Sequence, residues 1–144
     1  MKKVICALLA ALTVCCSAPV FADKVDDCMA MGEAVLNIDF KDTHTVSRSG
    51  NDVYFSFWHD DVAREVYEAA QGNAAYLETY GQMISGLQAM SKTLTGFFTD
   101  AGLDNINVYT VVLNDLNTDS ILVVYEDGKL EYDVVNGYHA PQTR

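Results

Sequence analysis

A mostly apolar stripe with the spacing of an α-helix runs through the middle of the chain, from Asp61 to Gly102. Its members recur at alternating steps of three and four, with charged and amide side chains between them, as on a helix that buries one face. The stripe consists of Val62, Val66, Ala69, Asn73, Leu77, Tyr80, Ile84, Leu87, Ser91, Leu94 and Phe98. This pattern predicts the core of the fold and by itself indicates no chemistry.

The residues Gln71-Gly72-Asn73, within the length of the stripe, favour a helix break and predict two helices rather than one. A single helix of about forty residues would be about 60 Å long, whereas a domain of this size is only about 35 Å across. Glycine weakens a helix and often ends one, and asparagine tolerates the left-handed backbone. We therefore expect a short helix from Asp61 to Gln71, capped by Asp60 or Asp61, and a longer helix from Ala74 to about Ala101.

The segment Val53–Trp58 is the clearest strand, because β-branched and aromatic residues fill it and turn residues precede it. Its alternation places Val53, Phe55 and Phe57 on one face, and Tyr54 and Trp58 on the other. Further strands are predicted at Ile106–Leu113, Ile121–Glu126 and Lys129–Val135, the last two joined by the hairpin turn Asp127-Gly128.

Two N-terminal segments complete the predicted fold. A helix is expected from Asp23 to about Leu36, followed by a strand at Asn37–Lys41 that continues toward Arg48. The sequence therefore predicts an α+β domain: an antiparallel sheet of about four strands with helices packed on one face, in the order β-α-α-β-β-β after an N-terminal helix.

The first 22 residues have the pattern of a secretory signal peptide. Lys2 and Lys3 precede an apolar run, and Val20-Phe21-Ala22 resembles a cleavage site. The run is about a dozen residues, too short to span a bilayer that needs about 20. We expect a bacterial protein that is secreted or periplasmic and is cleaved after Ala22, with lipid attachment at Cys15 or Cys16 as the alternative.

Removal of residues 1–22 would leave a single α+β domain at 23–136 and a loose C-terminal tail at 137–144. Cys28 would then be the one remaining cysteine, so no internal disulfide is expected. We interpret Cys28 as a small buried hydrophobic residue, with a disulfide between two copies as the alternative.

The net charge of the chain limits the kinds of molecule that it is expected to bind. The formal net charge is −11, and loss of the two signal-peptide lysines would make it −13. An acidic surface repels phosphate backbones and anionic lipids, which argues against nucleic acid and a membrane surface as partners. No second apolar run long enough to span a bilayer follows the first, so we expect no membrane insertion after cleavage. Cationic ligands, metal ions and basic partner proteins stay compatible with this charge.

The candidate catalytic or metal-binding residues are His59, Asp60 and Asp61, which lie where the predicted strand meets the predicted helix. His59 could act as a base, or bind a metal with one of the aspartates. The alternative is that the aspartates cap the helix and His59 is an exposed loop residue. No serine nucleophile elbow, zinc-binding helix, phosphate loop or paired-cysteine motif accompanies them. A small hydrolase or metal-dependent enzyme is therefore only the alternative function.

Asp115, Asn117 and Asp119, followed by Glu126, match the oxygen spacing of a calcium-binding loop. Ser120, however, stands where such a loop needs glycine. Both flanks also predict strands, which would carry Glu126 away from the aspartates. A polar hairpin turn explains this segment more simply, and we expect no metal and no cofactor.

Aromatic rings on both sides of the Val53–Trp58 strand are the remaining feature. If helices cover the Phe55 side, Tyr54 and Trp58 face outward and become candidate binding residues. The alternative is that a further segment of the chain covers them. The sequence thus predicts a small non-catalytic binding or interaction module that meets a partner protein or a second copy of itself.

Overall fold

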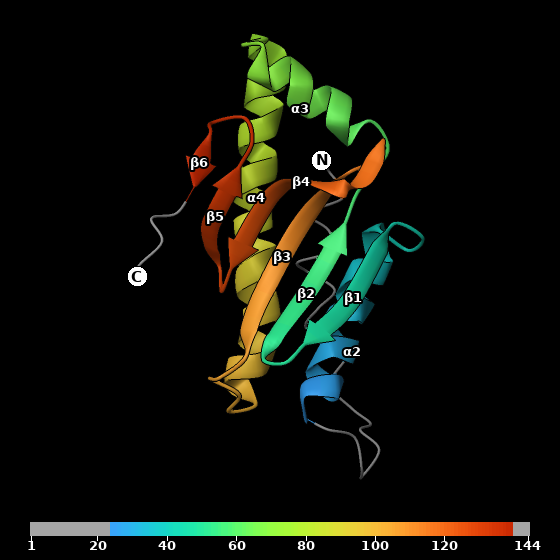
Figure 1. Cartoon of the computed structure of the whole chain (residues 1–144), viewed down its shortest axis with the longest axis vertical. Helices are drawn as coiled ribbons and strands as arrows, with labels where there is room; N and C mark the ends of the chain where they lie inside the picture. Colours follow the sequence, from blue (N-terminus) through green and yellow to red (C-terminus); the bar gives the residue numbers. More distant parts are fainter. Residues whose placement is uncertain (1–23, 140–144) are drawn as a thin grey trace.

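The computed structural model describes residues 24–139, which contain three helices and a six-stranded sheet (Figure 1). In chain order the elements are α2 (Lys24–Asp39), β1 (His44–Ser49), β2 (Asp52–Phe57), α3 (Val62–Ala70), α4 (Ala74–Asp100), β3 (Asn107–Asn114), β4 (Asn117–Glu126), β5 (Lys129–Asp133) and β6 (Tyr138–His139). The predicted α+β class is confirmed. The predicted signal peptide, with Cys15 and Cys16, lies outside the described residues.

The sheet is mixed rather than wholly antiparallel. Its strands lie in the order β1-β2-β3-β4-β5-β6, and every neighbouring pair is antiparallel except β2 and β3, which are parallel. The reason is the connection: α3 and α4 carry the chain back along the sheet, so β3 begins at the same end as β2. The sheet has six strands where about four are predicted, because β1 and the short β6 add one strand at each edge.

The expected strand at Asn37–Lys41 is not present, because α2 continues to Asp39. The buried residues of this helix keep helical spacing to its last turns, and Leu36 is fully buried. The amide of Phe40 donates to the Leu36 carbonyl at 2.8 Å, so the last turn closes normally. Local alternation at positions 37–41 was therefore a weaker signal than helix packing.

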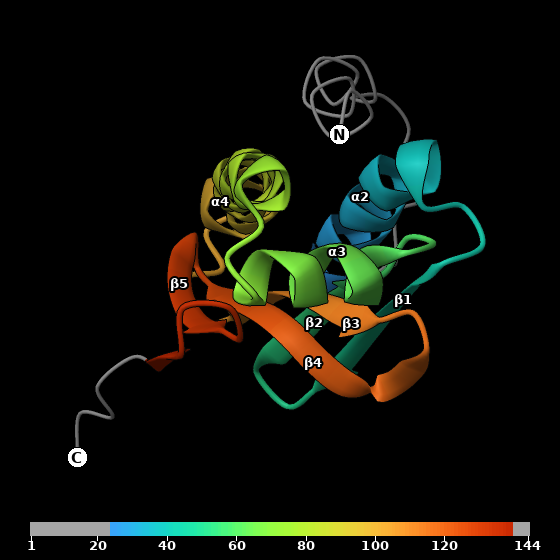
Figure 2. The same cartoon turned by 90° about the horizontal axis from the view of Figure 1, so that it is seen from above.

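The core lies between the sheet and α2 and α4, which pack on one of its faces (Figure 2). As predicted, Val53, Phe55 and Phe57 point into it, and each is at most 2% exposed. Phe55 meets Phe98 of α4 edge-on, with ring centroids 6.3 Å apart. The predicted helices at Asp61–Gln71 and Ala74–Ala101 agree with α3 and α4 to within one residue at each end.

Two polar groups sit inside this apolar layer and tie α4 to the sheet. Ser91 is fully buried, and its Oγ accepts a hydrogen bond from the Gly128 amide at 3.1 Å. Asp133, 2% exposed, accepts a 2.5 Å hydrogen bond from the Tyr80 hydroxyl. Burial, together with this bond, raises the pKa of Tyr80. Ser91, a polar member of the predicted stripe, is thus a hydrogen-bonded core residue.

Glycines of the two long helices should respond oppositely to substitution. A Cβ added at Gly81 of α4 meets nothing within 4 Å, so Gly81→Ala should raise the free energy of unfolding by about 0.5–1 kcal/mol. A Cβ at Gly32 of α2 would collide with the buried Phe55 ring, so Gly32→Ala should lower it by about 1–3 kcal/mol. Denaturant melts of both variants decide this, and equal shifts would contradict the helix–sheet packing.

Candidate functional site

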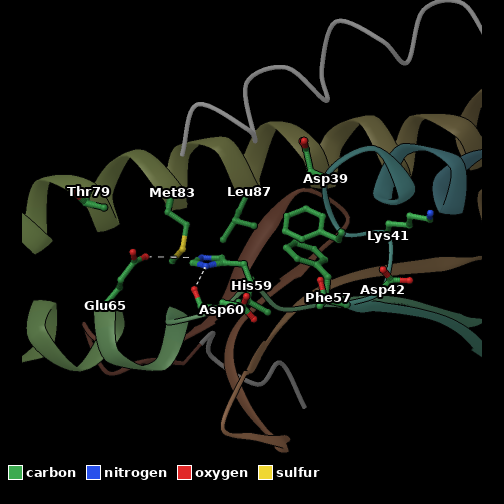
Figure 3. Close-up of a pocket in the computed structure, with 13 residues that line it drawn as sticks. Asp39, Lys41, Asp42, Phe57, His59, Asp60, Glu65, Thr79, Met83 and Leu87 are labelled. Atoms are coloured by element: carbon green, nitrogen blue, oxygen red, sulfur yellow. Dashed lines mark hydrogen bonds and ion pairs between the residues drawn. The ribbon is translucent and has the colours of Figure 1, made fainter.

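A cavity of about 670 Å³ opens at one end of the sheet, where five parts of the chain meet (Figure 3). The end of α2 with the loop after it, the end of β2 with the loop beyond it, α3, α4 and β3 each provide part of its wall. Its volume lies within the range of about 300–1,000 Å³ that is typical of small-molecule sites.

The floor of the cavity is apolar and aromatic. Phe40 and Phe57 pack together with ring centroids 4.4 Å apart, and Met83, Leu87 and Val112 continue the surface beside them. All five are buried residues of the protein, between 2% and 8% exposed. These side chains are held by the core, so the floor is formed before any ligand arrives.

Polar side chains stand at both ends of this floor (Figure 3). At the α3 end are His59, Asp60 and Glu65; at the other end the loop after α2 contributes a second group that includes Lys41 and Asp42. In the close-up, Phe57 lies between the two groups, and Met83 and Leu87 lie over the His59 end. The cavity therefore combines a dry floor with charged ends.

Among the side chains that line the cavity, His59 is the one best suited to acid–base chemistry. Its Nδ1 lies 2.9 Å from the Asp60 carbonyl oxygen, and its Nε2 lies 3.9 Å from Glu65 Oε2. The His59 side chain is 40% exposed and that of Glu65 is 34% exposed, so the pair sits at the mouth of the cavity. With Nδ1–H donating to the carbonyl, Nε2 is left as an acceptor on the side of Glu65, and a protonated ring would attract Glu65.

Asp61 plays a different part from the predicted one. It occupies the position before α3 with a left-handed φ of 70°, and its side chain makes no capping hydrogen bond. The cap comes instead from Asp115, whose Oδ2 accepts from the Asp61 amide at 2.9 Å and whose Oδ1 accepts from the Ala63 amide at 2.8 Å. A residue more than fifty positions away thus fixes the start of α3 and the adjoining His59–Asp60 segment.

The other two calcium-loop candidates lie in the first residues of β4, directly after the turn at Asp115-Leu116. Asn117 Nδ2 donates to Ser120 Oγ at 3.1 Å, and its Oδ1 accepts from the Asp119 amide at 3.2 Å. Within residues 24–139 no group of three or more histidine, cysteine or acidic side chains is arranged to hold a metal ion. The turn itself is Asp115-Leu116, and it places the Asp115 carboxylate at the start of α3.

Removing this cap should loosen α3. Asp115→Ala leaves the Asp61 and Ala63 amides without their acceptor and should lower the free energy of unfolding by about 0.5–2 kcal/mol. Amide hydrogen exchange at these two positions should accelerate more than exchange in β2. Asp119→Ala, in the same hairpin but exposed, is the control and should change stability by under about 0.5 kcal/mol. Equal effects of the two variants would contradict the capping role.

Tyr54 lies on the sheet face opposite to the helices, where it stacks on Tyr109 of β3 with centroids 4.9 Å apart. Tyr109 in turn donates to Glu126 at 2.9 Å. No helix of the described residues lies on that face (Figure 2). Trp58 lies just beyond β2, where its amide donates to the Thr43 carbonyl, and it packs against the core. The structure therefore pairs Tyr54 with Tyr109 rather than with Trp58.

Cys28 is buried in α2, and its thiol donates to the Phe97 carbonyl of α4 at 3.2 Å. Burial raises the pKa of this thiol, with a further contribution from the charge of Asp27. Both effects disfavour the reactive thiolate, which agrees with its interpretation as a small buried residue.

No protein-family model matches this chain, and neither curated proteins nor solved structures gave a match. Among the helices of residues 24–139, none is both long and apolar enough to cross a membrane.

Proposed function

We propose that this protein is an exported, non-catalytic binding module, and that the cavity beside His59 is where it holds its ligand. The observation that supports this most is a ready-formed aromatic floor between two groups of polar side chains. Ligand sites typically have this composition, with apolar walls for affinity and a few placed polar groups for orientation.

Blocking the cavity provides the test. Thr79 lines the wall on α4, whereas Thr45 is exposed on the edge strand β1, away from the cavity. Small aromatic compounds of each charge type should show weak binding in ligand-observed NMR with the parent protein. Thr79→Trp should abolish that binding and Thr45→Trp should preserve it. No binding by any compound, or binding that survives Thr79→Trp, would refute the proposal.

A small hydrolase centred on His59, Asp60 and Asp61 is the second candidate, and the approach of Glu65 to His59 favours it. A base oriented by a carboxylate is a common catalytic pair. Asp61, however, does not line the cavity, so any such pair would be formed by His59 with Glu65 or Asp60. Hydrolysis of p-nitrophenyl acetate that disappears in His59→Gln would support the enzyme, whereas the binding proposal expects no turnover dependent on His59.

The sheet face with Tyr54 and Tyr109 supports the expectation of a partner protein or a second copy. Aromatic side chains are common anchors at interfaces. Light scattering of the parent beside Tyr109→Ala tests this independently of the cavity, because Tyr109 does not line it. A parent that stays monomeric at every concentration would remove self-association as a role for this face.

A further inference from the structure

We propose that the ligand of this cavity is an organic cation, an ammonium group carried on an apolar body. The inference rests on the proposed binding function and adds the chemistry of the ligand to it. It follows from three features of the described residues: the aromatic floor, the sign of the charges around it, and the distance that separates those charges from one another.

The floor suits an apolar body rather than a sugar or a polar peptide segment. Phe40, Phe57 and Leu87 present buried carbon surface, and a ring or alkyl chain laid on it would lose contact with water. Phe40 and Phe57 pack against each other, so aromatic rings form part of this floor. A cation held over a ring face within about 6 Å of the ring centre is attracted by it.

The charges around the floor are mainly negative. Four carboxylates line the cavity, those of Asp39, Asp42, Asp60 and Glu65, against the single ammonium of Lys41. Glu65 is about two-thirds buried, so its attraction for a cation is screened less than on the open surface. The net charge of −11 adds a general field of the same sign. An anionic ligand would meet repulsion from each of these groups.

The carboxylates are spread around the cavity, and this arrangement favours an organic cation over a metal ion as the ligand. Asp60 and Glu65 stand near α3, while Asp39 and Asp42 stand across the apolar floor (Figure 3). Within the described chain these groups form no cluster of three that could coordinate one ion. A metal ion needs several oxygens at about 2.0–2.6 Å, whereas an ammonium on an apolar body needs one carboxylate beside a dry surface.

A matched series of three compounds tests the inference. Phenethylamine, 2-phenylethanol and 3-phenylpropionate share a phenyl ring and differ in charge, and each can be titrated into the full chain by ¹H–¹⁵N NMR at low salt. We expect the amine to bind about five-fold or more tighter than the alcohol, and the propionate to bind most weakly. Physiological salt should narrow the difference between the amine and the alcohol.

Charge variants give the second part of the test. Glu65→Gln should weaken phenethylamine about three-fold or more and leave 2-phenylethanol unchanged. Lys41→Gln should tighten the amine, a gain that damage to the fold would not produce. Glu78→Gln, exposed on α4 outside the cavity, is the control and should change neither.

The outcomes separate the two levels of the proposal. If the alcohol or the propionate binds as tightly as the amine, or if Glu65→Gln affects all compounds equally, the cation inference is wrong while the binding function stands. If no compound binds, the cavity is not a ligand site and both proposals fail.

Discussion

Leu94→Asp is expected to prevent the chain from folding. Leu94 lies on the buried side of α4, is fully inaccessible to solvent, and belongs to the same core cluster as Phe55 of β2. A carboxylate there would lose its hydration without gaining a partner, a cost of several kcal/mol that is comparable to the whole stability of a small domain. Far-ultraviolet circular dichroism and denaturant melts of the purified variant measure the loss.

The control for this prediction is Glu78→Ala, on the exposed side of the same helix, which should change stability by under about 0.5 kcal/mol. If Leu94→Asp melted like Glu78→Ala, α4 could not pack on the sheet in the way that the structure shows.

Asp133→Ala is expected to have the second-largest effect, a loss of about 3–5 kcal/mol. Asp133 lies at the end of β5 and is almost fully buried. Its oxygens accept hydrogen bonds from the Tyr80 hydroxyl, from the Val135 amide at 3.0 Å, and from both the amide and the side chain of Asn136. Removing the carboxylate leaves the buried Tyr80 hydroxyl and the partly buried donors of Val135 and Asn136 without their acceptor, which costs more than the bonds themselves contribute.

A double-mutant cycle separates this network from general damage to the core. Tyr80→Phe alone should cost about 1.5–3 kcal/mol, because it removes one donor to a charged acceptor. In the Asp133→Ala background the same change should cost much less, since the hydroxyl has already lost its acceptor. Strictly additive costs in denaturant melts would show that the two residues do not act as a pair.

Much of the fold could be predicted because the local patterns were strong. The long stripe gave α3 and α4 together with their break at Gly72, and the β-branched runs gave β2, β3 and the β4–β5 hairpin. The parallel pairing of β2 with β3 could not be read, because it depends on where a long helical connection returns the chain. Likewise, nothing local distinguished a strand at positions 37–41 from the last turn of α2, which tertiary packing decides.

The candidate site could be predicted only in part. His59 and Asp60 stood out because they follow a strand and precede a helix, and the structure places both on the cavity. Glu65 is one of the charged residues between the members of the stripe, which the pattern places on the exposed side of the helix, and Phe40 lies in the segment 37–41, for which the sequence predicts a strand. Phe40 could not be connected with His59, because the loop after α2 and the segment before α3 come to the same cavity only in the folded chain. The contact of Glu65 with His59 depends on how α3 is set relative to the loop before it. Asp115 is a candidate in the sequence only because of its calcium-like spacing. That spacing does not indicate its role in the structure, where it lies in the β3–β4 hairpin and caps the start of α3.

The most direct test of the central claim is the location of bound phenethylamine. In a ¹H–¹⁵N NMR titration the largest shift changes should cluster at the cavity, on the amides of His59, Asp60, Glu65 and Leu87, and the Thr79→Trp substitution should abolish them. Shift changes centred instead on Tyr54 and Tyr109 would move the binding surface to the open face of the sheet. That result, or no saturable change anywhere in the spectrum, would contradict the cavity as the ligand site.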